Sequence, residues 1–574
     1  MSKIRKSAAV AAILVCVGAA QAAVTNKVVL APNAMPIRDA SLASAFPIMG
    51  VAGSLVGEGE DAKTFFETKR EETAAVWRRA GIRLVRQWDA VAQWQTGAGC
   101  GRSWRGNKPG YTYEEYRTDM KNVFSFYKEY GIKVVLTLEN YSVYTDPYTG
   151  ARTNDLKIVT KTICDYLKWI IDNGFKDVVA GFELGNEPYW NAYGEGKISG
   201  EEYAARWTAI VLEMVKVWPK ASIGLAIAEY FAGDPDVKAV RNRMLSDQKI
   251  KETDYFGERV SNQWSARYIV AMSNALPYVT HVIYHSYGGC VPESCSPCGI
   301  ARYRIFNTAF PELKGKKMWI TEWRERSDED NRSHQHFRET LFKAGYMLGM
   351  VAQPDVDGLN LHQISSLAGV LYVSRPNKKE AGRGNFMVQW DSRNNDRPDY
   401  NSIGETRLEV GIAGPMFRLY NEALLRHPLV MDFGSDASFL SAGKTNFWMA
   451  SCYYGEMLGL RNAIQSGKER PVLKQRNCDV LVTMNKAKSS VSLLACNMKG
   501  ESAFYEVTCD GYNLYSPDIR VYECPEKFLD ASELPGEGHY TRQYGYELYP
   551  KPSPFIIEIP ANSITTVTIP IAKK

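Results

Sequence analysis

Short apolar runs recur along the first three quarters of the chain, and stretches with helical spacing separate them. This alternation predicts parallel strands joined by helices. Eight runs fit the description: 46–51, 82–87, 132–138, 178–184, 222–227, 281–285, 317–321 and 357–362. The clearest helical stretches are 64–80, 114–130, 155–173, 201–218 and 334–351. Eight strand–helix units predict an α/β fold, a (β/α)8 TIM barrel over residues 46–425.

Glycine and proline residues refine the boundaries of these helices. Gly81 and Gly131 each stand between a helical stretch and the next strand, where glycine supplies the left-handed conformation that ends a helix. The last barrel helix is expected at 409–425. Pro415 lies inside that span and predicts either a kink or a later start.

The pattern changes after about residue 426, where helical spacing fades and short strand-like runs alternate with polar turns. These runs are 447–453, 479–484, 491–497, 503–508, 519–524, 555–559 and 564–569. They predict an all-β antiparallel sandwich domain over residues 426–574. The N-terminal segment 23–45 precedes the barrel, and we expect its run 27–30 to add a strand to the sandwich.

The first 22 residues have the pattern of a secretory signal peptide. A basic start with Lys3, Arg5 and Lys6 is followed by an apolar stretch, and Ala20-Gln21-Ala22 fits the cleavage pattern. We therefore expect cleavage after Ala22 and a secreted or periplasmic location. The apolar stretch is too short for a membrane span, and no other segment suits one.

Charge and cysteine content narrow the classes of partner. The formal net charge is +5, and it falls to +2 once the three basic residues of the signal peptide are removed. So small an excess gives no reason to expect nucleic-acid binding. In an exported chain, Cys100, Cys290, Cys295 and Cys298 favour disulfides, with a zinc site as the alternative. Cys164 lies on an apolar helical face and is expected in the core.

Ionisable residues stand where the fourth and seventh predicted strands end. Barrel enzymes place their chemistry at these carboxyl ends. Glu187 follows the fourth strand and Glu322 follows the seventh, on opposite sides of the predicted barrel mouth. Glycosidic cleavage requires two such groups, one carboxylic acid to protonate the leaving oxygen and one carboxylate to attack the anomeric carbon.

Gly185-Asn186-Glu187-Pro188 together with Thr321-Glu322-Trp323 resembles the motifs of clan A of the glycoside hydrolases. The resemblance covers the predicted barrel. It implies hydrolysis with retention, with Glu187 as general acid/base and Glu322 as nucleophile. The sequence is similar both to the heparanase and β-glucuronidase family and to the β-xylosidase and α-L-iduronidase family.

The same resemblance suggests partners for the two glutamates. Arg86 would support the nucleophile, and Asn186 would hold the sugar 2-hydroxyl. His285-Ser286-Tyr287 matches the His-x-Tyr of the clan, whose tyrosine contacts the nucleophile. His285 is also expected to contact the substrate, and the further predicted substrate contacts are Trp88, Asn140, Tyr141, Trp323 and His362. Glu183 is either a third carboxylate of the site or, as we favour, a buried partner of an arginine such as Arg86.

These observations predict a retaining glycosidase that acts on an extracellular poly- or oligosaccharide and needs no cofactor and no metal. Two alternatives stay open: a transglycosylase with the same site, and a non-catalytic glycan-binding barrel protein. Phosphate-binding loops and serine-nucleophile or metalloprotease motifs are absent from the sequence.

Overall fold

The computed structural model describes residues 26–40, 49–52, 70–87, 113–138, 144–145, 152–153, 155–188, 199–227, 258–288, 307, 310–325, 337–352, 354–362, 370–374, 407–431, 478–526, 529, 541–544, 550–551 and 554–574. The predicted signal peptide and the predicted strand 447–453 lie outside these residues. The same is true of Cys100, Cys290, Cys295 and Cys298, so the disulfide prediction stays a prediction.

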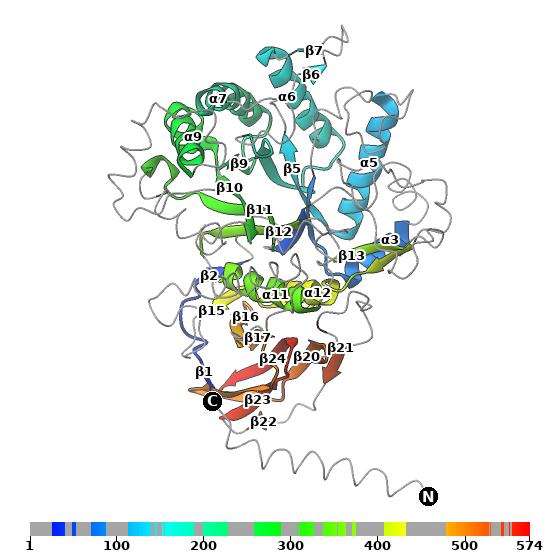
Figure 1. Ribbon diagram of the computed structural model, residues 1–574, viewed down its shortest axis with the longest axis vertical. Coiled ribbons are helices and arrows are strands. Elements are labelled where there is room, and N and C mark those ends of the chain that lie inside the picture. The colour runs from blue at the N-terminus through cyan, green and yellow to red at the C-terminus, as the bar shows by residue number, and fades with distance from the viewer. Residues whose placement is uncertain are drawn as a thin grey trace, which may run out of the picture.

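A closed barrel of eight parallel strands forms the larger unit (Figure 1). Its strands are β3 (Met49–Ala52), β4 (Leu84–Gln87), β5 (Lys133–Leu138), β8 (Val179–Leu184), β9 (Ile223–Ala226), β10 (His281–Gly288), β11 (Lys317–Glu325) and β12 (Val356–His362). Pairing of β12 with β3 closes the ring. All eight predicted strands are confirmed, with ends shifted by a few residues.

Helices connect and cover these strands. They are α3 (Arg70–Arg79), α5 (Tyr113–Tyr130), α6 (Leu156–Asp172), α7 (Gly200–Val217), α9 (Glu258–Ala271) and α11 (Phe337–Val351). Polar caps fix two of the starts: Asp155 accepts from the backbone N–H of Lys157 at 2.8 Å, and Ser199 accepts from that of Glu202 at 3.0 Å. Helix α9 was not predicted.

Two predicted boundary features are confirmed and one boundary was wrong. Gly81 and Gly131 have φ angles of +70° and +68°, as the helix ends require. The last helix, α12, spans Gly414–Arg426 rather than 409–425. Glu409 instead belongs to β14 (Arg407–Val410), which pairs antiparallel with β13 (Leu371–Ser374). The helix begins where Pro415 can occupy its first turn, which is the later start foreseen for that proline.

A tryptophan fills the barrel interior below the strand ends. Trp319 packs with Leu84, Val135 and Ile283 in a buried cluster. Room for its indole comes from two glycines, because a Cβ at Gly181 would lie 2.3 Å from the ring and one at Gly224 would lie 3.0 Å away. Because this buried cluster is closely packed, it limits the movement of the side chains at the carboxyl ends of the strands.

At the amino ends of the strands, a buried polar group ties the N-terminal segment to the barrel. Arg38 of β2 (Arg38–Asp39) donates to the Val356 carbonyl, and its guanidinium lies 3.6 Å from Asp357. Asp357 in turn contacts His281 at 2.8 Å. Because β2 also pairs with β15 (Leu429–Met431), this segment joins the barrel to the C-terminal unit.

The C-terminal unit consists of two sheets over one hydrophobic cluster. The nine-stranded sheet contains β2, β15, β16 (Cys478–Met484), β17 (Ser490–Asn497), β19 (Tyr512–Tyr515), β20 (Asp518–Glu523), β21 (Thr541–Tyr544), β22 (Pro550–Lys551) and β24 (Ser563–Lys573). The three-stranded sheet contains β1 (Asn26–Leu30), β18 (Ala503–Cys509) and β23 (Phe555–Ile559). The segment before the barrel supplies β1, as predicted. Because β1 pairs with β18 in parallel, the second sheet is mixed rather than purely antiparallel.

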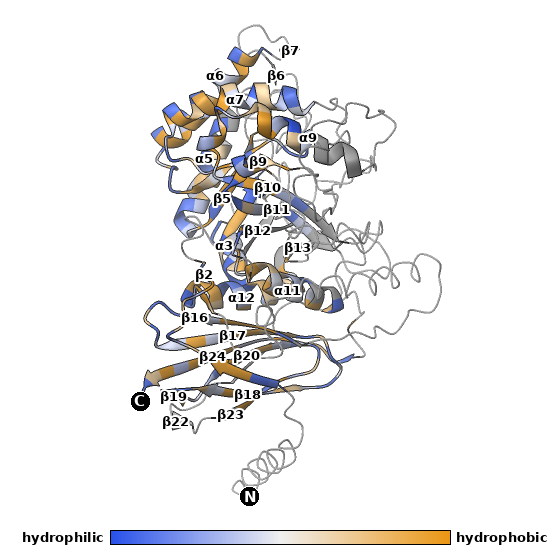
Figure 2. Ribbon diagram, turned by 90° about the vertical axis from the view of Figure 1, so that its left-hand side faces the viewer, coloured by the Kyte–Doolittle hydropathy of each residue, from blue (hydrophilic) through white to orange (hydrophobic). Residues whose placement is uncertain are grey.

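Helices α11 and α12 lie between the barrel and the C-terminal sheets (Figure 2). Tyr420 of α12 donates to the Ala495 carbonyl at 2.9 Å. On α11, a Cβ at Gly345 would stand 3.2 Å from a carboxylate oxygen of Asp479. The two units therefore share a packed interface.

Cys164 is buried in α6, as predicted. Within the described ranges, no helix combines the length and the apolar character that crossing a membrane requires.

Candidate active site

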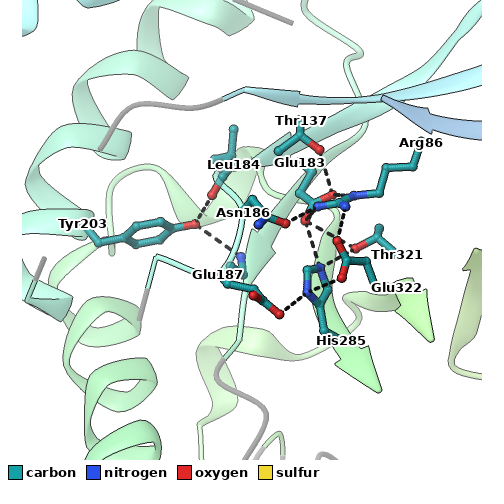
Figure 3. Close-up of polar contacts among 11 residues, drawn as sticks. Arg86, Thr137, Glu183, Leu184, Asn186, Glu187, Tyr203, His285, Thr321 and Glu322 are labelled. Carbon is teal, nitrogen blue, oxygen red and sulfur yellow. Dashed lines mark hydrogen bonds and ion pairs between the residues drawn. The ribbon is translucent and has the colours of Figure 1, made fainter. Parts of the chain in front are cut away.

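Polar side chains from β4, β5, β8, β10 and β11 converge at the carboxyl ends of these strands (Figure 3). The group comprises Arg86, Thr137, Glu183, Asn186, Glu187, His285, Thr321 and Glu322. All but Glu187 are almost fully buried. The side chain of Glu187 is 12% exposed, so it is the member that borders solvent.

Arg86 is the centre of this network. Its Nε and Nη2 both donate to Glu183, the latter at 2.7 Å. Nη1 donates to Oε1 of Glu322 at 2.6 Å, and Nη2 also donates to Oδ1 of Asn186 at 2.7 Å. One buried guanidinium thus holds two carboxylates and orients the Asn186 amide. The preferred interpretation of Glu183, as a partner of Arg86, is confirmed.

The turn after β8 places Glu187 in an unusual backbone conformation. Gly185 has φ of +83°, and Glu187 itself has φ of +45°, in the left-handed region that non-glycine residues rarely adopt. Such strain persists only when surrounding contacts maintain it, and it concentrates at functional sites.

Tyr203 of α7 supplies one of these contacts. Its hydroxyl donates to the Leu184 carbonyl at 2.7 Å and accepts from the backbone N–H of Ala226 at 3.3 Å. This fully buried phenol ties the end of β8 to the end of β9, directly before the strained turn. Sequence reasoning missed Tyr203, whose only signal was an apolar helical position next to Ala204.

An irregularity between β10 and β11 sets the position of Glu322. Tyr284 pairs with Ile320, but the next residue, His285, pairs with Glu322, so Thr321 is the extra residue of a bulge. A bulge re-aims the side chains that follow it. Here both Thr321 and Glu322 contact His285.

His285 lies between the two predicted catalytic glutamates. Its Nδ1 is 2.8 Å from Oε1 of Glu187 and 3.5 Å from Oε2 of Glu322. Burial lowers the pKa of His285, but the charge of Glu322 and the contacts with Glu183 and Glu187 outweigh it and raise the pKa to about 10. The carboxylates around the ring therefore favour its protonated form.

Glu183 is held in its ionised form by the positively charged Arg86 beside it. Burial alone would raise its pKa, but attraction to Arg86, with hydrogen bonds from His285 and Arg86, lowers it below the ordinary value. Thr137 also donates to it at 3.2 Å. Glu183 is thus a buried anion that binds Arg86 and also contacts His285.

The two predicted catalytic carboxyl groups face one another. One oxygen of Glu187, one oxygen of Glu322 and one nitrogen of His285 lie within 4.8 Å of each other. Such a set has the spacing of metal ligands. A metal there would compete with a proton for the ring nitrogen of His285, because a protonated ring nitrogen is not a ligand.

The prediction that Trp323 contacts substrate was wrong. Its side chain is 1% exposed and stacks on Tyr346 of α11, with ring centroids 4.3 Å apart. Successive strand residues point to opposite faces, so with Glu322 directed into the site, Trp323 points into the helix layer. It packs the barrel wall.

Other predicted contacts are not tested. Tyr287 and His362 stand at the ends of β10 and β12, but their side chains are outside the described part of the chain. Trp88, Asn140 and Tyr141 lie wholly outside it.

Comparison with known proteins gives a fold and no family. No protein-family profile matches the sequence, and no curated protein matches it at a significant level. Solved structures do match. The α-L-arabinofuranosidase from Thermotoga maritima has a TM-score of 0.56 at 11% identity, over 95% of this chain and 100% of that one.

Two further structures agree with this result. A family 51 α-L-arabinofuranosidase from Bifidobacterium longum has a TM-score of 0.54 at 12% identity, over 95% of this chain and 99% of that one. A glucosidase from Croceicoccus marinus has a TM-score of 0.53 at 9% identity, over 95% and 98%. At such identities the similarity shows the barrel fold alone, and the two families named from the sequence are not confirmed.

Proposed function

We propose that this chain is a retaining glycoside hydrolase in which Glu322 is the nucleophile and Glu187 the general acid/base. The observation that carries the proposal is the pair itself, because oxygens of Glu187 and Glu322 lie within 4.8 Å across the barrel mouth. Carboxyl groups about 5–5.5 Å apart are typical of retaining enzymes, whereas inverting enzymes separate them by about 6.5–9.5 Å to admit a water molecule.

The surroundings of the two glutamates differ in a way that suits these roles. Glu322 is 3% exposed and bound by Arg86, which stabilises a carboxylate ready to attack. Glu187 has no contact with Arg86 among the described interactions and borders solvent at 12% exposure, where a leaving group can reach it. Its only described side-chain partner is His285.

In the first step, Glu322 attacks the anomeric carbon and the bond to the leaving oxygen breaks. The leaving oxygen takes a proton delivered by Glu187. In the second step, water attacks the same carbon, Glu187 takes a proton from that water, and the Glu322 carboxylate is released. Asn186, fixed by Arg86, is placed next to Glu187 to hold the sugar 2-hydroxyl.

The substrate belongs, on this proposal, to extracellular or periplasmic carbohydrate, because residues 1–22 have the pattern of an export signal. The structural neighbours act on arabinofuranosides and glucosides, so these sugars head the set to be tested.

The test is a screen of aryl glycosides and polysaccharides that includes arabinofuranosides, glucosides, xylosides, uronic acids and sulfated glycans. The protein is compared with Glu322→Gln and with Glu213→Gln, a surface change on α7 that serves as a control. We expect turnover on at least one sugar, lost by about 10⁴-fold or more in Glu322→Gln only. Binding of a glycan without turnover by the parent would instead indicate a non-catalytic barrel protein.

A further inference from the structure

The contacts of His285 fix the number of protons around its ring. Nε2 lies 3.1 Å from Oγ1 of Thr321 and 3.4 Å from Oε1 of Glu183. Thr321 donates its own hydroxyl proton to Glu183 at 3.3 Å, so Oγ1 is left as an acceptor toward the ring. Both neighbours of Nε2 are acceptors, and therefore Nε2 carries a proton.

The other ring nitrogen, Nδ1, faces Glu187 and Glu322. At 2.8 Å from Oε1 of Glu187, the contact needs one proton between the two atoms. That proton resides either on Glu187, with a neutral ring, or on His285, with an ionised Glu187.

The charges facing the ring decide between these two positions. From β8 and the turn that follows, Glu183 and Glu187 face His285, and from β11 Glu322 faces it. Arg86 of β4 binds two of these carboxylates, Glu183 and Glu322. Three buried or nearly buried carboxylates around one imidazole favour a positive charge on the ring, which touches all three.

We propose that His285 holds the catalytic proton in the substrate-free enzyme, so that Glu187 and His285 act as one proton-sharing pair rather than Glu187 alone. This inference rests on the proposed glycosidase function. It makes His285 a positioning residue that acts through Glu187, in place of the direct substrate contact expected from the sequence.

The proton and charge balance of the first step supports this arrangement. Before reaction, Arg86 and His285 contribute two positive charges and the three glutamates three negative ones. As Glu322 forms its ester, its charge disappears and the C–O bond electrons go to the leaving oxygen. The proton on Nδ1 passes to Glu187, and Glu187 gives that proton to the leaving oxygen, so the His285 ring becomes neutral. Arg86 then faces Glu183 and Glu187 alone, so the net charge of the site is −1 before and after.

The second step reverses these transfers. Water gives its proton to Glu187 and onward to Nδ1 while its oxygen bonds to the anomeric carbon, and Glu322 recovers its charge. The charge of Glu322 thus controls where the proton rests, because it is the strongest influence that raises the pKa of His285.

The test is NMR of the full mature chain labelled with 15N at the histidine rings. Loss of its signals in His285→Asn assigns this ring among the seven histidines. We expect both nitrogens of His285 to be protonated at pH 7. In Glu322→Gln, a neutral group of the same shape as the charged one, the titration midpoint of His285 should fall by about one pH unit or more.

His281, at the opposite end of β10, is the internal control, since its ring contacts Asp357 and not Glu322. Its signals should not respond to Glu322→Gln. A neutral His285 ring at pH 7 in the parent, or an unchanged midpoint in Glu322→Gln, would overturn the inference. Neither result depends on turnover, so they are distinct from failure of the substrate screen, which would overturn the proposed function.

A kinetic arm separates proton delivery from a structural role. His285→Asn should slow hydrolysis of glycosides with poor leaving groups about tenfold more than hydrolysis of 2,4-dinitrophenyl glycosides, which need no proton. Equal slowing of both would show that His285 only holds Glu322 in place, and would contradict the proton-sharing pair.

Discussion

Nη1 of Arg86 donates a 2.6 Å hydrogen bond to Oε1 of Glu322, although 236 residues separate the two in the sequence. The same guanidinium binds Glu183, so its removal leaves two buried carboxylates without the guanidinium that binds both. Breaking a buried ion pair by removing one partner costs about 3–5 kcal/mol. Arg86 therefore stabilises both the fold and the charge on Glu322.

These two roles can be separated by substitution. Arg86→Met should lower both the melting temperature and kcat/KM. Adding Glu183→Gln to Arg86→Met removes the negative charge that Arg86 no longer neutralises. The double variant should therefore recover part of the lost melting temperature, while its kcat/KM stays low. Calorimetry and kinetics of the two variants check this. A double variant no more stable than Arg86→Met would mean that Glu183 does not depend on Arg86.

Glu187 can be tested by chemical rescue. Glu187→Ala should reduce hydrolysis of substrates with poor leaving groups by about 10²–10⁴-fold. With an activated aryl glycoside, azide should restore turnover, since it attacks the glycosyl-enzyme without a base. The product should be a glycosyl azide of the same anomeric configuration as the substrate, which NMR can identify. Failure of azide to accelerate turnover would argue against the acid/base role.

Asp479 provides a pH test of the interface between α11 and β16. Its Oδ2 has no hydrogen-bond partner among the described residues, and burial raises its pKa from 3.8 to about 8. A raised pKa of an acid means that stability is fully present below about pH 4 and is lost as pH rises through about 8. This follows because the unfolded chain releases the proton first.

Asp479→Asn removes this dependence. We expect the variant to gain on the order of a few kcal/mol over the parent at pH 8, and much less at pH 5. Denaturant unfolding at the two pH values measures the gain, with Asp510→Asn, on an exposed turn, as the control. The same gain at both pH values would show that Asp479 is not protonated in the folded protein.

The parts of the fold that repeat were predictable, and those set by single contacts were not. The eight barrel strands are short apolar runs, and their spacing alone located them. Helix α9 was missed because its apolar residues gather in the second half of Glu258–Ala271 and form no continuous stripe. The two-residue strands β2 and β22 are too short to show any period.

The candidate site also contains some residues that the sequence predicts and some contacts that it does not. Glu187 and Glu322 stand out because they end strands, and strand order predicts that such residues meet. The contacts of His285 with Thr321 and Glu322 depend on a bulge at Thr321 that no local pattern reveals. The burial of Trp323, by contrast, could have been predicted, because the side chains of neighbouring strand residues such as Glu322 and Trp323 point to opposite faces of the sheet.

The central claim, that Glu322 is the nucleophile of a retaining glycosidase, is tested most directly by trapping the intermediate. The protein is incubated with an activated 2-deoxy-2-fluoro glycoside of the sugar found in the screen, digested with pepsin, and analysed by mass spectrometry. We expect one covalent glycosyl adduct per chain, located on Glu322. An adduct on Glu187, or rapid turnover with inverted anomeric configuration and no adduct, would contradict it.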